Sequence, residues 1–366
     1  MRTELNDRQL GATAFVLLLS PALRLFPSAG AQSAGKTLWL SALLAFFPAA
    51  AYLFLVCRAA ALRREGEGMG ELLLRAAPGR GGRFALCVLG AWLLVYAGFV
   101  LRSGADRFIV TVYPNTPAAF FILTMAAAAL AAAFAPLRDA ARCARMFLPV
   151  VTLVLALVLG AALFGVRKEN LLPLEPRGPG GLLVGTLGAL DLLAWAIAAG
   201  CLLLPEVKKG ACSFGALLRP LALGCAVLAL LGVTIVGSFG AALSGALSWP
   251  FFSLVRDLVF FRSVERIEAL VVALWIFPDF LIVSLFLRGA LRALGLTLGR
   301  RFPPLAQKKL ALPLCALAAA FFALLAAPDA NALARWSRLY IPAANLFFSF
   351  VFFPGILAVG RKKGRI

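Results

Sequence analysis

Charged and aromatic side chains recur together at helical spacing inside long apolar stretches of the chain. Residues three and four positions apart share one face of a helix. One such stripe comprises Trp92, Tyr96, Phe99, Arg102 and Asp106. A second comprises Glu268, Val272, Trp275 and Asp279, and a third comprises Asp191, Trp195 and Ala198. Rings can hold the apolar part of a small solute while charges hold its ends, so the pattern predicts binding of a small amphipathic molecule.

A second candidate lies in the stretch LGATAFVLLLSPALRLFP, from Leu10 to Pro27, which is apolar yet contains Ser20, Pro21 and Arg24. Proline removes a backbone donor, so the helix is expected to break near Ser20. Irregular backbone persists at membrane depth only where it packs in protein or faces a watery cavity. The stretch therefore predicts a cavity beside Ser20, Pro21 and Arg24.

Two plainer interpretations of these residues stay open. The charges can simply pair with one another and fix helix packing, above all Arg102, Asp106 and Glu268, which lie near helix ends. Arg24, Asp191 and Asp279 lie deeper and are more informative, because ionisable groups at membrane depth usually mark a pathway. Interface anchoring by aromatic side chains is the expected role of Trp39, Trp249, Trp336 and Tyr340. The predicted topology places the vestibule of the pocket toward the outside.

Composition sets the class of protein. Hydrophobic residues make up 62% of the 366 positions and charged residues 14%, with a mean hydropathy of +0.95, which is typical of a polytopic membrane protein. The net charge of +20 comes from lysines and arginines in short loops, where they orient helices rather than bind nucleic acid. The chain has no histidine, and its seven cysteines form no CxxC pair. We expect no enzyme activity, no metal, no cofactor and no disulfide framework.

Ten apolar segments are long enough to cross a bilayer. They run roughly over 10–27, 38–56, 84–101, 118–134, 147–164, 182–204, 217–239, 269–287, 310–326 and 339–359. The first segment also resembles a signal-peptide core, but its mixed charges and Pro21 favour a retained helix. Most of the 36 lysines and arginines fall in loops on one side if both termini are cytoplasmic, which supports that topology.

Ten spans divide into five plus five, and an odd number of helices in each half makes the second half enter from the opposite side. We therefore predict one all-α domain over 1–366, with an inverted repeat at about 6–166 and 180–360. The counterpart of the first helix is the sixth, at Gly180 to Pro205, which is interrupted by small residues. These are Gly185, Gly188, Ala196, Ala198, Ala199 and Gly200.

The stretch SWPFFSLVRDLVFFRSVERIEALVVALWIFPDF contains a recognisable series: a proline, an arginine, then a Glu-Arg-x-Glu run leading to tryptophan. The residues are Pro250, Arg256, Glu265, Arg266, Glu268 and Trp275. Further pieces follow the same order along the chain, namely NDRQL at 6–10, LR with Asp106 four residues on, PNTP at 114–117 and NLLPLEP at 170–176. Together these motifs resemble the spore-germination permease family, the membrane-embedded B subunits of nutrient germinant receptors.

The resemblance implies a fold of the amino acid, polyamine and organocation transporter superfamily, which is LeuT/APC-like with broken helices 1 and 6. It also implies sensing of a small nutrient in the inner membrane of the spore, together with an A-type membrane subunit and a C-type lipoprotein. The chain departs from the family at Ser20-Pro21 and at the alanines of the sixth helix. Because Arg24 is also unexpected there, an anionic ligand group facing Arg24 is a separate hypothesis.

Three functions are compatible with the sequence. The first is a sensor in which ligand binding biases two arrangements of the protein. The second is a proton- or sodium-coupled amino acid transporter, with Asp191 or Asp279 carrying the coupling charge, and the third is an assembly subunit without a ligand. The predicted ligand-binding residues are Ser20, Pro21, Arg24, Tyr96, Trp195, Ala198, Gly200 and Trp275. The predicted pathway or coupling charges are Arg102, Asp106, Asp191, Glu268 and Asp279.

Overall fold

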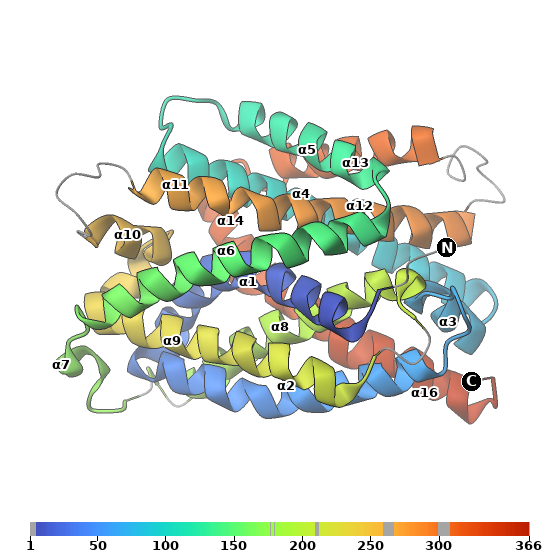
Figure 1. The fold of residues 1–366 in the computed structure, drawn as a ribbon, viewed down its shortest axis with the longest axis horizontal. Helices are drawn as coiled ribbons and strands as arrows, with labels where there is room; N and C mark the ends of the chain where they lie inside the picture. Colours follow the sequence, from blue (N-terminus) through green and yellow to red (C-terminus); the bar gives the residue numbers. More distant parts are fainter. Residues whose placement is uncertain are drawn as a thin grey trace.

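Long apolar helices account for most of the computed structural model of this chain (Figure 1). The structure describes residues 5–175, 177–178, 180–208, 212–258, 267–298 and 308–365. The helices before the predicted midpoint are α1 (Asp7–Ala34), η1 (Gly35–Thr37), α2 (Leu38–Ala61), α3 (Met69–Ala76), α4 (Arg80–Thr111), α5 (Ala118–Phe134), α6 (Leu137–Leu163) and α7 (Lys168–Leu171). Those after it are α8 (Gly181–Gly200), η2 (Cys201–Glu206), α9 (Phe214–Ala246), α10 (Pro250–Asp257), α11 (Ile267–Leu274), α12 (Ile276–Leu298), α13 (Lys308–Leu325), α14 (Ala330–Arg335), η4 (Trp336–Tyr340), α15 (Ile341–Leu346), η5 (Phe347–Phe352) and α16 (Phe353–Lys362).

Seven of the described helical stretches are long and apolar enough to cross a membrane, and the first of them, Asp7–Ala61, contains both α1 and α2. Two shorter apolar helices, Ala118–Phe134 and Leu310–Leu325, accompany them. Each predicted segment overlaps a described helix, while the count of ten spans stays a prediction. The start of α1 and the end of α16 lie at one end of the molecule, which we call the termini end (Figure 1).

The first helix differs from the prediction. α1 runs through Ser20 and Pro21 as one α-helix, without the interruption that the sequence predicts. Its start is fixed by a capping box in which the Asn6 side chain accepts from the Gln9 backbone N–H. Nearly the whole of α1 is buried against α8 and α9. Prolines are tolerated in such a helix because packed neighbours hold the backbone that lost one hydrogen bond.

The sixth helix changes type only at its end. Gly185 and Gly188 lie inside the continuous helix α8, and the α-helix gives way to the 3-10 helix η2 after Gly200. Gly185 serves close packing, because a Cβ there would lie 2.6 Å from the Cβ of Ala34 and 2.7 Å from the Oγ of Ser41. Of the small residues predicted to interrupt this helix, only the last one marks a change in backbone geometry.

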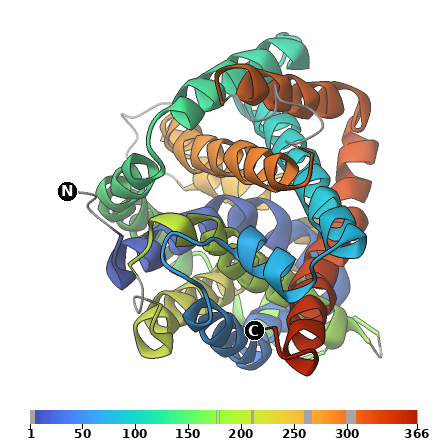
Figure 2. The same cartoon turned by 90° about the vertical axis from the view of Figure 1, so that its right-hand side faces the viewer.

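Two groups of four helices build the core. α1, α2, α8 and α9 pack together, and α4, α5, α12 and α13 form the other group. Figure 2 shows both groups from the termini end. Each group takes two helices from each predicted half, as an inverted repeat requires, although the repeat itself stays a prediction. α1 of the first group also contacts α12 of the second group.

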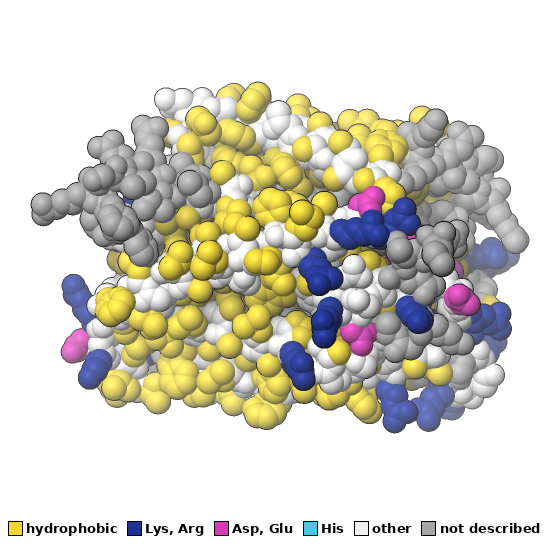
Figure 3. All heavy atoms as spheres, viewed as in Figure 1, with side chains coloured by type: hydrophobic (Ala, Val, Ile, Leu, Met, Phe, Trp, Pro, Cys, Tyr) yellow, Lys and Arg dark blue, Asp and Glu magenta, His cyan; other side chains and the backbone are white. Residues whose placement is uncertain are grey.

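The surface agrees with a membrane setting. Apolar side chains cover the middle of the face in Figure 3, and lysines and arginines gather toward the termini end. Many large apolar side chains are exposed, such as Phe47 at 70% and Leu153 at 60%. Such exposure is unfavourable in water and neutral in lipid, so the described surface is that of a multi-pass integral membrane protein.

Candidate functional site

A buried ion pair joins α4 to α12 within the second helix group, at the place where α1 of the first group contacts them. The Nη2 of Arg107 lies 2.7 Å from the Oδ2 of Asp279, and the two side chains are 1% and 0% exposed. The second carboxylate oxygen of Asp279 accepts a short hydrogen bond from the Oγ of Ser20 on α1. Three helices therefore meet at one carboxylate. Ser20, which is predicted to bind ligand, is a hydrogen-bond partner of Asp279, and its contact with a ligand stays a prediction.

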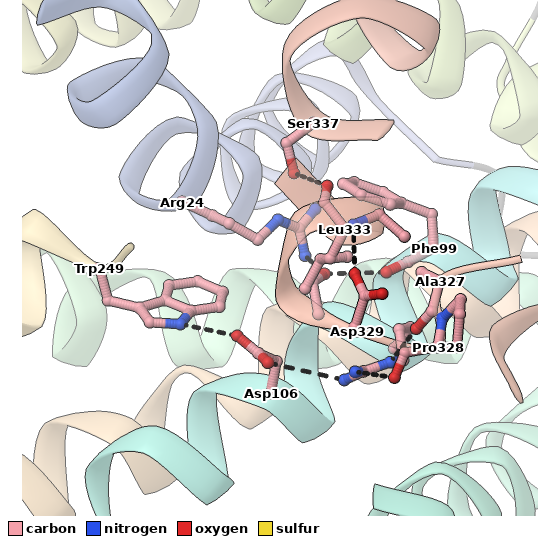
Figure 4. A network of polar contacts seen from close by, with 12 residues as sticks. Arg24, Phe99, Asp106, Trp249, Ala327, Pro328, Asp329, Leu333 and Ser337 are labelled. Atoms are coloured by element: carbon pink, nitrogen blue, oxygen red, sulfur yellow. Dashed lines mark hydrogen bonds and ion pairs between the residues drawn. The ribbon is translucent and has the colours of Figure 1, made fainter. Parts of the chain in front are cut away.

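Arg24 lies one turn further along α1 and points toward α4 (Figure 4). Its Nη1 donates to the Oγ of Ser103 at 2.7 Å, and its guanidinium sits 5.0 Å from the centre of the Phe99 ring. The Nε and Nη2 atoms are buried and have no hydrogen-bond partner among the described residues. A buried guanidinium with two free donors is a site that an anion can complete.

The charges in this region do not balance. Arg24 interacts electrostatically with both Asp279 and Arg107. Asp279 is already paired with Arg107, so Arg24 adds a positive charge that neither neighbour neutralises. Burying an uncompensated charge is costly, and proteins retain such charges mainly where a ligand or pathway uses them.

A second polar cluster lies beside Arg24 (Figure 4). The Nη1 of Arg102 lies 3.7 Å from the Oδ1 of Asp106, which confirms the predicted pair. Arg102 also donates to the backbone carbonyl of Ala327 at 2.6 Å. The indole N–H of Trp249 donates to Asp106 at 3.1 Å, and Trp249 is 5% exposed. Trp249 is therefore a buried partner of Asp106, and its predicted role as an interface anchor is wrong.

Aromatic rings connect this region to the middle of the molecule. Tyr96 contacts the rings of Phe99, Trp195 and Phe286 at centroid distances of 6.1, 5.5 and 5.1 Å. Since Arg24 lies over Phe99, one run of rings leads from Trp195 through Tyr96 to the arginine. Of the three predicted stripes, those on α4 and α8 bring Tyr96, Phe99 and Trp195 together.

Asp191 is a further buried charge within electrostatic range of Tyr96. Its Oδ1 accepts from the Nδ2 of Asn345 at 2.7 Å, and the residue is 1% exposed. The amide carries no charge, and the described residues form no ion pair with this carboxylate. Tyr96 interacts electrostatically with Arg24 and with Asp191.

Cavities approach this core from both ends. Arg24, Ser103 and Asp106 line a pocket of about 70 Å³ toward the end of the molecule opposite the termini. A larger cavity of about 470 Å³ extends from Arg292 at the termini end to Trp195. The ring of Trp195 forms part of the inner wall of this cavity and helps to keep it apart from Arg24. A further cavity of about 330 Å³ is lined by Asp191, Ser337 and Arg338, and the outward position of the vestibule stays a prediction.

Other predicted residues lie away from Arg24. Ala198 lines the termini-end cavity, and Gly200 lines a small apolar space of about 50 Å³ against α1. Pro21 is buried within α1. Trp275 is fully buried and packs on Phe251 at 5.5 Å. Glu268 belongs to α11, but the structure does not describe its side chain. Glu265 and Arg266 lie outside the described residues.

Several partners were not predicted from the sequence. Arg107, Ser103 and Asn345 complete the polar contacts of Asp279, Arg24 and Asp191. Their spacing is one signal that could have identified Ser103 and Arg107 from the sequence. These two residues follow Phe99 at four-residue steps on α4 and so share one face of that helix.

The seven cysteines are free thiols in different surroundings. Cys143 is exposed, and the Sγ atoms of Cys57 and Cys212 lie 3.7 Å apart although the residues are 155 positions apart. None of the described residues form a group of three or more acidic, cysteine or histidine side chains that could hold a metal ion.

Comparisons with known proteins agree with this architecture. The sequence model of a family described as "Spore germination protein" matches residues 5–330. No curated protein matches the sequence. Among solved structures, a nucleobase-cation-symport-1 family transporter, Mhp1, in a closed conformation with bromovinylhydantoin bound, is similar with a TM-score of 0.65. The match covers 94% of this chain and 77% of that one at 14% identity, so it shows the fold alone and confirms the LeuT/APC-like class.

Proposed function

We propose that this chain, which belongs to the spore germination protein family, is the membrane-embedded nutrient-sensing subunit of a germinant receptor. Its ligand is a small nutrient with a carboxylate, such as an amino acid. The observation that carries the proposal is the buried Arg24 guanidinium, whose Nε and Nη2 atoms have no hydrogen-bond partner in the described structure. The protein sits in the spore inner membrane with both termini cytoplasmic and works with an A-type membrane subunit and a C-type lipoprotein.

Arg24 fits a carboxylate for reasons of geometry and charge. Two adjacent donors of a guanidinium match the two oxygens of a carboxylate, and such bidentate pairs are strong and directional. The incoming negative charge also offsets the excess positive charge of Arg24 and Arg107 over Asp279. The rings of Phe99 and Tyr96 provide an apolar surface for the rest of the ligand, and Asp191, within electrostatic range of Tyr96, offers an acceptor for an ammonium group.

Ligand binding can change the arrangement of the two helix groups. Arg24 belongs to α1 in the first group, while its partner Ser103 and the ring beneath it belong to α4 in the second group. A ligand held between these helices binds one arrangement better than the other and shifts the population toward it. Partner subunits then read the new arrangement, and no chemical step is needed.

A pair of ligands of similar size that differ in the carboxylate gives the sharpest test. L-Alanine and L-alaninamide differ in the carboxylate, so the wild-type chain is expected to prefer the acid. Arg24→Gln keeps a hydrogen-bonding side chain without the charge and is expected to remove that preference. A hydrogen bond to a charged group contributes about 1.5–3 kcal/mol, so the preference should fall by about 10-fold to 150-fold. Binding is measured by calorimetry on the purified chain, with Arg83→Gln at the termini end as the control.

The outcomes separate the possible roles. An acid preference that persists in Arg24→Gln would reject Arg24 as the carboxylate site. If the wild-type chain binds none of a panel of amino acids and none of their amides, an assembly subunit without a ligand is favoured instead. Equal binding of an amino acid and its amide would mean that the ligand is recognised only through its ammonium group.

A coupled amino acid transporter is the second candidate, and Asp191 is the observation that favours it. A buried carboxylate with one neutral partner can pick up and release a proton during transport. Asp279 is less suited to that role because Arg107 already neutralises it. Uptake into proteoliposomes decides between the two, since concentrative flux that Asp191→Asn abolishes would favour transport.

A further inference from the structure

A deep groove lies between α2 and α16 at the termini end, away from Arg24. Its volume is about 750 Å³. The wall consists largely of apolar side chains, among them Phe54, Leu55, Leu62 and Leu357. Phe54, Leu55 and Leu62 are 45%, 52% and 48% exposed, so the groove opens on the surface that faces lipid.

Two arginines stand at the groove. Arg58 comes from the last turn of α2 and Arg361 from the last turn of α16. The side chain of neither one makes a hydrogen bond or ion pair with the described residues; the Arg58 guanidinium rests 5.3 Å from the centre of the Phe54 ring. The lining contains no acidic side chain. The groove therefore combines an apolar trough with two positive charges that have no counter-ion in the described structure.

We propose that this groove binds an anionic phospholipid, with the phosphate between Arg58 and Arg361 and an acyl chain along Phe54, Leu55 and Leu357. Charge and shape both favour a lipid over a soluble phosphate. Basic side chains at the ends of membrane helices attract anionic headgroups. The apolar trough gives an acyl chain a place that a free phosphate cannot use, since burial scales with apolar area.

The bound lipid would touch the central helix. Ala198 and Cys201 form part of the groove wall, at the point where α8 gives way to η2. Ala198 also lines the cavity that extends to Trp195. The anionic lipid thus rests against the termini-end half of the sixth helix, independently of whether a nutrient binds at Arg24.

Photo-crosslinking tests the site on the full chain. The purified protein is placed in phosphatidylcholine nanodiscs that contain a small fraction of phosphatidylglycerol with a diazirine on one acyl chain, and labelled peptides are identified by mass spectrometry. We expect labels in the segments 52–62 and 353–361. Removing one surface arginine weakens attraction of an anionic headgroup roughly fivefold, so Arg58→Ala/Arg361→Ala should reduce labelling of the groove about 25-fold.

Matched controls separate the groove from general attraction to positive charge. Arg80→Ala/Arg83→Ala removes the same charge at the same end from exposed positions outside the groove, and it should leave labelling unchanged. Ala358→Phe narrows the groove while keeping both arginines, and it should reduce labelling. A thermal unfolding curve like that of the wild type shows that each variant is folded.

Three results would overturn the proposal. One is equal labelling by photoactivatable phosphatidylglycerol and phosphatidylcholine, and another is labelling spread evenly over the lipid-facing helices. The third is loss of labelling when glycerol phosphate is added at millimolar concentration, which would mean that a soluble phosphate suffices to fill the site.

Discussion

Removing Asp279 is expected to destabilise the protein more than removing its partner Arg107, although the two side chains share one ion pair. The pair is fully buried, with 2.7 Å between Nη2 and Oδ2. In an isolated pair, loss of either member leaves one unpaired charge. Here Arg24 is a third charge within electrostatic range, so the two substitutions leave different net charges behind.

The magnitude follows from the remaining charges. Asp279→Asn leaves Arg24 and Arg107 together without a counter-ion, and an uncompensated buried charge costs about 3–5 kcal/mol. Arg107→Met leaves Asp279 with Arg24 as its counter-ion, so the loss is closer to that of one charged hydrogen bond, about 1.5–3 kcal/mol. The double variant Arg107→Met/Asp279→Asn restores the net charge of the wild type. It should therefore be more stable than Asp279→Asn alone.

Thermal unfolding in detergent can be followed with a thiol-reactive fluorophore, because the buried Cys225 and Cys315 react only when the protein opens. We expect Asp279→Asn to have the lowest Tm and the double variant to recover part of the loss. A Tm for Asp279→Asn at or above that of Arg107→Met would refute the role given to Arg24. So would additive effects in the double variant, because residues in one charge network should couple.

Two further predictions test the packing of α2. Oxidation with diamide should join Cys57 to Cys212, because their Sγ atoms are 3.7 Å apart; mass spectrometry should find the linked peptides, and continued alkylation of both thiols would contradict the geometry. Gly232→Ala should destabilise the protein by about 1–3 kcal/mol, because a Cβ there would lie 2.9 Å from the backbone of Trp39. Gly215→Ala in the same helix is the control, since a Cβ there meets nothing within 4 Å, and equal unfolding temperatures would contradict the close approach.

Hydropathy and spacing predict the helices and much of the ring cluster, because both depend on local sequence. The contacts of the charged residues depend on tertiary structure instead. Arg107 and Asp279 are 172 positions apart, and no local pattern connects them. The sequence likewise predicts that Trp249 is an interface anchor, whereas in the fold its indole N–H donates to Asp106. The continuity of α1 at Pro21 is also a tertiary effect, because its packed neighbours hold a helix that proline alone would weaken.

Under the proposed function, the charge of the ligand is coupled to the position of α1. Ser20 and Arg24 lie on one helix and reach Asp279 and Ser103 on the other helix group, one through a hydrogen bond to the carboxylate and one through a guanidinium. If the proposed carboxylate used both free donors in one arrangement only, a difference in binding energy of about 3 kcal/mol would shift the equilibrium between the two arrangements about 150-fold.

That shift serves a sensor and a transporter equally. The two differ at the rings of Trp195 and Tyr96, which stand between Arg24 and the termini-end cavity. If these rings stay in place while α1 moves, the ligand signals and leaves by the way it came. If they separate, the same binding energy opens a route across the membrane, so the function depends on the rings and not on the affinity of Arg24.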